Sequence, residues 1–156
     1  MKSVNSTQLI EKIEETLSNI KSFNGLSPLA ESYYAQFLVV FICGIYEEII
    51  ESTITEMVYK TNNVEIRNFV EKLMEYSFQN PNWERVKDLI YKFDNQNWIN
   101  EINLIPEKNR SALNSICENK NALAHGTSTF TLTISDVENY YIDSKMILEK
   151  IDDLLL

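Results

Sequence analysis

The sequence predicts an all-α domain. Three glycines and three prolines among 156 residues leave little turn chemistry for a many-stranded sheet. Apolar residues recur at spacings of three and four along most of the chain, which is typical of amphipathic helices. They make up 44% of the chain against 24% charged residues, as in a globular protein with a packed core. We therefore expect one domain over residues 1–156, with an N-terminal helix and turn at 1–26 and a core at 28–156.

The first helix is predicted at residues 7–22. Its apolar residues form one stripe, while glutamate and lysine occupy the other face. Ser6 or Thr7 is a suitable N-cap, because a hydroxyl oxygen can accept a free backbone N–H at a helix start. A polar turn then separates this helix from the core. The apolar stripe consists of Leu9, Ile10, Ile13, Leu17 and Ile20.

A long central helix is predicted from Pro28 to about Lys60, with Ser27 as its N-cap. At ~1.5 Å per residue it would reach roughly 50 Å, and Gly44 is a point at which it could bend. Residues 33–46 are apolar nearly all round. A helix of this kind is buried on most sides, so we expect it to form the centre of the core.

The middle of the chain predicts shorter helices. Apolar spacing indicates a third helix over residues 62–78, and Asn82 is placed to cap a fourth over 83–93. Residues 94–97 are polar and are expected to form a loop. Residues 98–105 are expected to form a short helical turn anchored by apolar side chains.

A motif helix is predicted to begin at Pro106 and to end at His125. Proline suits a first helical position, where its missing N–H costs nothing, and Gly126 suits the left-handed residue that ends a helix. Asn121 and His125 are four residues apart and share a face, and the long side chain of Lys120 can reach toward it. An ammonium, an amide and an imidazole at one helix end can form a phosphate site. From these residues alone, a histidine that interacts with the helix dipole is the commoner arrangement.

The last helix is predicted to end at about Leu155. Ser135 and Glu138 fit a capping box at its start, with Ser at the N-cap and Glu three residues on. Residues 127–134 alternate polar and apolar side chains, but they have no obvious partner strand. We therefore expect this segment to be a loop.

The stretch from Lys120 to Gly126 reads Lys-Asn-Ala-Leu-Ala-His-Gly and resembles the HEPN signature. In that signature an arginine, usually followed by asparagine, precedes a histidine by four to six intervening residues. Here four residues intervene, and the family's arginine is Lys120. The resemblance covers residues 30–156 and is strongest to the RiboL-PSP-HEPN branch. It implies an all-α, HEPN-type helical bundle with a long central helix, joined to a second copy about a twofold axis.

The resemblance also implies a function: metal-independent cleavage of RNA, with no cofactor, at a composite site between two subunits. His125 would transfer protons, Lys120 would stabilise the phosphorane, and Asn121 would bind phosphate or orient the imidazole. Glu47 or Glu48, just after the aromatic stretch, would lie near the motif helix and support it. The products would be a 2′,3′-cyclic phosphate and a 5′-hydroxyl, and DNA would resist because it lacks the 2′-hydroxyl nucleophile.

Composition limits the alternatives. A formal net charge of -9 argues against broad, nonspecific binding to nucleic acid but allows a local phosphate site. One histidine and two distant cysteines do not make a zinc site, and Cys43 and Cys117 are expected to be reduced, buried thiols. The longest apolar run, residues 37–46, is too short to cross a membrane. We expect a cytoplasmic protein with no membrane partner.

Three hypotheses remain open at the level of sequence. The first is a homodimeric HEPN endoribonuclease acting as a toxin or phage-defence effector, with an antitoxin or a larger defence complex as further partners. The second is a catalytically weak or inactive HEPN module that binds RNA or a partner protein, which Lys120 and the acidity favour. The third is a helical interaction domain in which His125 is only a cap.

Overall fold

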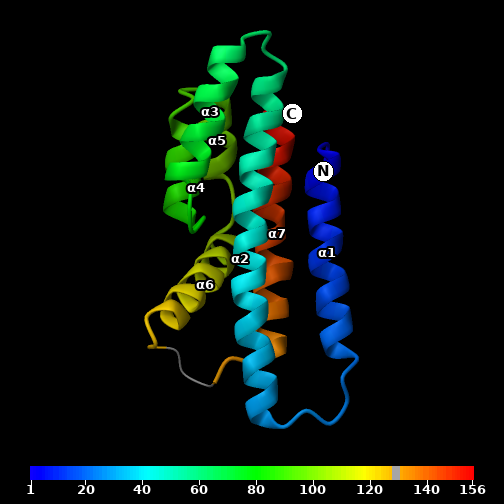
Figure 1. Cartoon of the computed structure of the whole chain (residues 1–156). Helices are drawn as coiled ribbons and strands as arrows, with labels where there is room; N and C mark the ends of the chain where they lie inside the picture. Colours follow the sequence, from blue (N-terminus) through cyan, green and yellow to red (C-terminus); the bar gives the residue numbers. More distant parts are fainter. Residues whose placement is uncertain (128–130) are drawn as a thin grey trace.

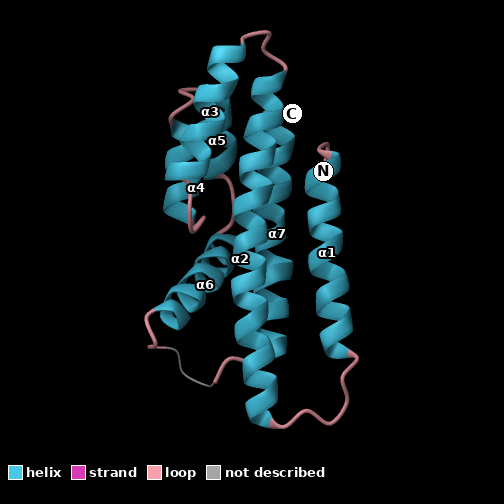
Figure 2. Ribbon diagram, in the orientation of Figure 1, coloured by secondary structure: helices cyan, strands magenta, loops and turns pink. Residues whose placement is uncertain are grey.

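The computed structural model describes residues 1–127 and 131–156. Within these residues it contains seven helices and no strand, which confirms the prediction of an all-α fold (Figures 1 and 2). Residues 128–130, part of the loop predicted at 127–134, lie outside the described residues. The helices are α1 (Val4–Lys21), α2 (Pro28–Tyr59), α3 (Val64–Ser77), α4 (Trp83–Tyr91), α5 (Gln96–Asn103), α6 (Glu107–Ala124) and α7 (Ile134–Leu155).

Helix α2 is the axis of the bundle, as its apolar sequence predicts. The Ser27 side chain accepts the Ala30 N–H and Pro28 takes the first helical position, as expected. The helix then runs for 32 residues without interruption at Gly44. Most faces of its central turns are fully buried, because α1, α3, α6 and α7 all pack against it. Those buried at 0% exposure include Leu38, Val39, Ile42, Cys43, Tyr46 and Ile50.

The other helices surround α2 in two groups. Helices α1 and α7 lie alongside it on its long axis, while α6 packs on both α2 and α7 and slants away from α2 toward its own C-terminal end (Figure 1). Helices α3, α4 and α5 gather at the other end of the molecule, where α3 contacts α2, α4 contacts α6 and α5 contacts α7. The slant of α6 carries its last turn away from the core.

The start of α1 differs from the prediction. It begins at Val4 with Ser3 as its N-cap, rather than with Ser6 or Thr7. The buried carboxylate of Asp152, near the end of α7, accepts the Ser3 N–H at 3.1 Å and also the Lys2 N–H. This distant carboxylate holds the first residues in place, so the helix starts earlier than the local sequence indicates.

The start of α7 also corrects the prediction. The capping box consists of Thr133 and Asp136 rather than Ser135 and Glu138. Ile134 is buried in the core, which favours a helix that begins before Ser135. In the described part of the loop before it, Thr127, Thr131 and Leu132 are not helical.

Two further helix starts also differ from the prediction. Helix α5 begins at Gln96, inside the segment expected to be a loop, because Asn95 caps it by accepting the N–H groups of Asn97 and Trp98. Pro106 is the N-cap of α6 rather than its first residue. The Asn82 cap of α4 is confirmed, since its side chain accepts the Arg85 N–H.

Candidate active site at the end of α6

The motif helix ends in a fixed geometry. Gly126 adopts a φ of 67°, the left-handed conformation that a residue with a side chain adopts only at a cost. The Thr127 N–H donates to the Ala122 carbonyl at 2.9 Å, and the Gly126 N–H donates to Leu123 at 3.1 Å. This pair of bonds is the Schellman arrangement, which satisfies the last carbonyls of a helix. It confirms Gly126 as the residue that ends α6 and fixes the backbone of His125 just before it.

The three motif side chains lie on the accessible end of α6. His125 is the C-cap residue and is exposed, and Asn121, one turn earlier, is half-buried. Among the described residues, neither side chain makes a hydrogen bond, so both have donors and acceptors available to a ligand. The Lys120 side chain is 31% exposed. The end of α6 thus carries an imidazole, an amide and an ammonium within six residues of the chain.

Glu47 of α2 is the nearest acidic group to Lys120. The Lys120 ammonium lies 3.9 Å from a Glu47 carboxylate oxygen, which is too long for a direct hydrogen bond. That same oxygen accepts the Asn80 N–H at 2.5 Å. Asn80 lies in the α3–α4 connection, so this bond joins that connection to α2. Glu47 is therefore held by a backbone donor while Lys120 stays available to an anion.

Glu48 occupies a different surface. Consecutive helical residues point about 100° apart, so Glu47 and Glu48 cannot face the same neighbour. Glu48 lines an acidic groove between α2 and α3 together with Glu51, Glu71 and Glu75. Burial, with the nearby charges of Glu75 and Glu48, raises the pKa of the Glu51 carboxyl. Of the two glutamates expected near the motif helix, the structure brings Glu47 to Lys120 and not Glu48.

The two cysteines meet one helical turn behind this ion pair. The sulfur atoms of Cys43 and Cys117 are 4.0 Å apart, and both residues are buried free thiols. Burial and the reduced state confirm the prediction, but the two cysteines, 74 positions apart in the sequence, were not expected to lie in contact. Their positions carry a signal that was missed: Cys43 precedes Glu47 by four residues, and Cys117 precedes Lys120 by three.

A second set of contacts positions α6 nearer its start. The Asn114 side chain accepts the Trp83 N–H at 2.9 Å, and the Arg110 guanidinium lies 5.5 Å from the centre of the Trp83 ring. Trp83 is buried at the start of α4. These contacts hold the first half of α6 against α4, so its last turn projects in a fixed direction.

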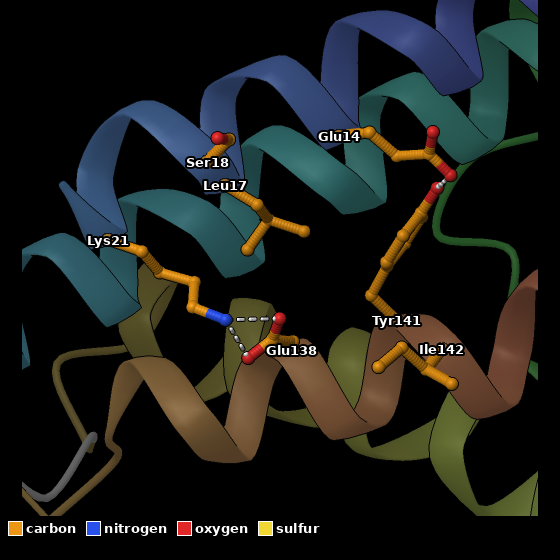
Figure 3. A pocket seen from close by; sticks show the side chains of 7 residues that line it. All are labelled: Glu14, Leu17, Ser18, Lys21, Glu138, Tyr141 and Ile142. Carbon is orange, nitrogen blue, oxygen red and sulfur yellow. Dashed lines mark hydrogen bonds and ion pairs between the residues drawn. The ribbon is translucent and has the colours of Figure 1, made fainter.

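The groove between α1 and α7 is separate from the motif. Figure 3 shows that Lys21 reaches across it to both carboxylate oxygens of Glu138, at 2.6 and 2.8 Å, and that the Tyr141 hydroxyl donates to Glu14. Lys145 also pairs with Glu14, which lowers the pKa of that carboxyl. The charged groups of this groove are paired with one another. They attach α1 to the core and are therefore less available to bind a ligand.

Within the described residues, no three His, Cys, Asp or Glu side chains gather where they could hold a metal ion. In the same part of the chain, every helix is too short or too polar to cross a membrane.

Comparison with known proteins gives one match. The sequence model of the family described as RiboL-PSP-HEPN matches residues 5–156, which is nearly the whole chain and includes α1. No curated protein and no solved structure matches significantly.

Proposed function

The chain belongs to the RiboL-PSP-HEPN family, and from this membership we propose that it is a metal-independent endoribonuclease. HEPN domains are generally nucleases or RNA-binding modules, and the resemblance at Lys120–Gly126 supplies the residues for the first. The observation that carries the proposal is the accessible end of α6. His125 and Asn121 share a face there, and the partly exposed Lys120 is the residue next to Asn121. We propose a cytoplasmic toxin or phage-defence effector, with an antitoxin or a larger defence complex as its partner.

The proposed chemistry follows from the groups present. His125 accepts the proton of the ribose 2′-hydroxyl, or donates one to the departing 5′-oxygen, because an imidazole exchanges protons near neutral pH. Lys120 stabilises the negative charge that develops on the phosphorane. Asn121 donates its amide N–H to a phosphate oxygen or orients the imidazole. The attacking oxygen belongs to the substrate, so the products are a 2′,3′-cyclic phosphate and a 5′-hydroxyl, and DNA is not cut.

A second subunit completes the proposed site. One α6 end supplies a single imidazole on an open surface, whereas two ends about a twofold axis supply one group to accept a proton and one to donate it. Two exposed apolar side chains on α2, Phe37 and Val40, support this assembly. They share a face of α2 with Gly44, which is also exposed. Gly44 lies one turn before Glu47, so this apolar face is next to the Glu47–Lys120 pair. A partner seated there would close the site.

The experiment that tests the proposal is RNA cleavage by the purified protein in EDTA, beside His125→Ala. We expect cleavage of single-stranded RNA or tRNA that leaves 2′,3′-cyclic phosphates and is lost in the variant. Asn119→Ala, on the same helix, is the control, because the one hydrogen bond of the Asn119 side chain within the described residues is to the Ser115 carbonyl of its own helix. Intact RNA with the wild-type protein, or equal cleavage by His125→Ala, would overturn the proposal.

A non-catalytic HEPN module that binds RNA or a partner protein is the second candidate. Lysine in place of the family's arginine favours it, because lysine keeps the charge but lacks the planar fork that holds a phosphate through two bonds. The carboxylate of Glu47 beside Lys120 favours it as well, since it reduces the pull of the ammonium on an anion. RNA binding without cleavage in the same experiment would support this candidate.

A further inference from the structure

Helices α2 and α6 face each other through two pairs of side chains, one turn apart. One pair is Glu47 and Lys120, beside the motif. The other is Cys43 and Cys117, whose sulfur atoms are 4.0 Å apart and whose exposed fractions are 0% and 1%. Cys43 lies one turn before Glu47 on α2, and Cys117 lies one turn before Lys120 on α6. A bond between the two sulfurs would therefore join the helices directly behind the motif.

We propose that Cys43 and Cys117 are an oxidation site, at which a peroxide converts the two thiols into a disulfide that cross-links α6 to α2. The sulfurs are already near van der Waals contact, and they must approach from 4.0 Å to about 2.05 Å, the length of the bond. Rotation of either side chain about its Cα–Cβ bond moves a sulfur atom by such a distance. Each thiol can form an intramolecular disulfide with one partner, since the chain has two cysteines.

The two thiols of the pair can exchange roles in the reaction. Either sulfur can donate the hydrogen bond between them. Either thiol can therefore be the one that, once it has lost its proton, attacks the peroxide, because the thiolate is the reactive form. The attacking sulfur displaces hydroxide from the O–O bond and becomes a sulfenic acid, and the hydroxide takes a proton to form water.

The second thiol of the pair completes the reaction. Its sulfur attacks the sulfenic sulfur, and the departing hydroxide takes the proton of the second thiol and leaves as a second water. Two thiols and one hydrogen peroxide thus give one disulfide and two waters. The peroxide is the oxidant, and its small size suits a buried pair that is reached through brief local opening.

The cross-link restricts the motif helix. Once the two sulfurs are bonded, α6 cannot move away from α2 at Cys117. Lys120 lies one turn after Cys117, so the bond also fixes the distance between Lys120 and Glu47. A thiol reductant reverses the change. Formation of the disulfide does not depend on the proposed nuclease activity. The effect of the disulfide on RNA cleavage does rest on that activity, so bond formation and cleavage are measured separately.

The first test is peptide mapping of the full-length folded protein after treatment with hydrogen peroxide. We expect one linked peptide pair containing Cys43 and Cys117, a loss of two hydrogens from the intact monomer, and reversal by dithiothreitol. Cys43→Ser and Cys117→Ser, each with one thiol, cannot give this species and serve as controls. Sulfinic acid at either cysteine without the linked pair, or disulfides only between two chains, would overturn the proposal.

A second measurement uses only the wild-type chain, so it does not depend on how the serine variants fold. We expect the oxidised protein to unfold at a higher urea concentration than the reduced protein, because the disulfide closes a long loop in the unfolded chain, between residues 74 positions apart. An unchanged or lower midpoint in a sample shown to be cross-linked would contradict a bond that secures α6 to α2.

The third measurement is RNA cleavage by oxidised and reduced wild-type protein, with peroxide-treated Cys117→Ser as the control for other oxidation. We expect a roughly tenfold lower rate for the cross-linked protein, since small displacements of catalytic groups cost large factors in rate. Equal rates would overturn the effect on the motif. If neither form cleaves RNA, the proposed function fails, and the linked peptide still decides the oxidation site.

Discussion

Lys120 stands where the family signature has arginine, and its surroundings make the difference testable. Its ammonium has a single acidic neighbour, Glu47, at 3.9 Å, and it makes no hydrogen bond among the described residues. A lysine here acts on a phosphate as a point charge. An arginine would add two parallel N–H donors in a fixed plane.

Lys120→Arg is therefore expected to raise RNA cleavage. The gain should be roughly tenfold, which corresponds to about 1.4 kcal/mol in the transition state. Initial rates in EDTA measure it. Lys108→Arg is the matched control, because Lys108 is on the same helix but pairs with Asp143 near its start. If Lys120→Arg and Lys108→Arg behave alike, Lys120 does not contact the phosphate.

Glu47 is expected to weaken RNA binding by its charge. In a His125→Ala background, which prevents cleavage, Glu47→Gln should lower the Kd for RNA roughly threefold, the effect of removing one partly exposed charge beside Lys120. The new amide oxygen can still accept the Asn80 N–H, so the local structure is kept. Fluorescence anisotropy at fixed salt gives the Kd.

Glu48→Gln is the control for that measurement. It removes the same charge from the next residue, which lies in the acidic groove rather than beside Lys120. Equal changes in Kd for Glu47→Gln and Glu48→Gln would indicate a general effect of net charge and would contradict a local role for Glu47.

At the scale of elements, the first residue of a helix depends on which of its side chains are buried in the core. Helix α7 begins at Ile134, which is buried, and Thr133 and Asp136 satisfy its first donors. Ser135 lies inside the helix and is exposed. The sequence contains two overlapping cap patterns, and packing selects the earlier one.

This selection predicts different costs for two similar substitutions. Thr133→Ala should lower the free energy of unfolding by about 1 kcal/mol, because it removes the side-chain acceptor of the Asp136 N–H. Ser135→Ala should change it by less than about 0.5 kcal/mol, as an exposed helical site allows. Urea denaturation measures both, and a larger loss for Ser135→Ala would contradict the observed cap.

Helix α1 is attached to the rest of the bundle by Asp152. Asp152→Ala leaves the Ser3 and Lys2 N–H groups without their acceptor in a largely buried setting. The expected loss is about 2–3 kcal/mol of stability, the cost of an unsatisfied buried donor. Hydrogen exchange should also become faster along the first turn of α1.

Asp153→Ala is the control for this helix attachment, because Asp153 is the next residue and its side chain is exposed. The backbone carbonyl of Asp153, which accepts from Lys2, is unchanged by the substitution. Equal stability of the two variants would contradict a role for the Asp152 side chain in attaching α1.

At the scale of the whole molecule, the unexplained feature is an apolar surface on an acidic protein. Phe37 is 50% and Val40 47% exposed on α2, while the chain carries a net charge of -9. Two copies repel each other through this charge, so association requires a contact that buries apolar area. The face leading to the Glu47–Lys120 pair is the one we propose for that contact.

Phe37→Asp is accordingly expected to convert a dimer into a monomer in sedimentation velocity and to abolish RNA cleavage with it. The substitution places a charge in an apolar contact and in its symmetry mate. Phe69→Asp is the matched control, since Phe69 is 67% exposed on α3, at the other end of the molecule. A monomeric wild-type protein that still cleaves RNA would rule out the composite site.

Most helices and their apolar faces could be predicted from local patterns in the sequence. The apolar periodicity of α2, the Ser27–Pro28 start and the Gly126 end are set by interactions within about four residues, which a local pattern contains completely. The motif itself spans only seven residues, Lys120 to Gly126, so it too is contained in a local stretch of sequence. So does the family, because its signature and the apolar pattern around it are both linear.

Which helix faces meet depends on the packing of the whole core and could not be predicted from local patterns. The contact of Cys43 with Cys117, the choice of Glu47 over Glu48 beside Lys120, and the caps at Ser3 and Thr133 all depend on how helices pack. The register of α6 on α2 comes from close packing of the whole core, in which many weak contacts act together. Those contacts join residues far apart in the chain, and no local pattern records them.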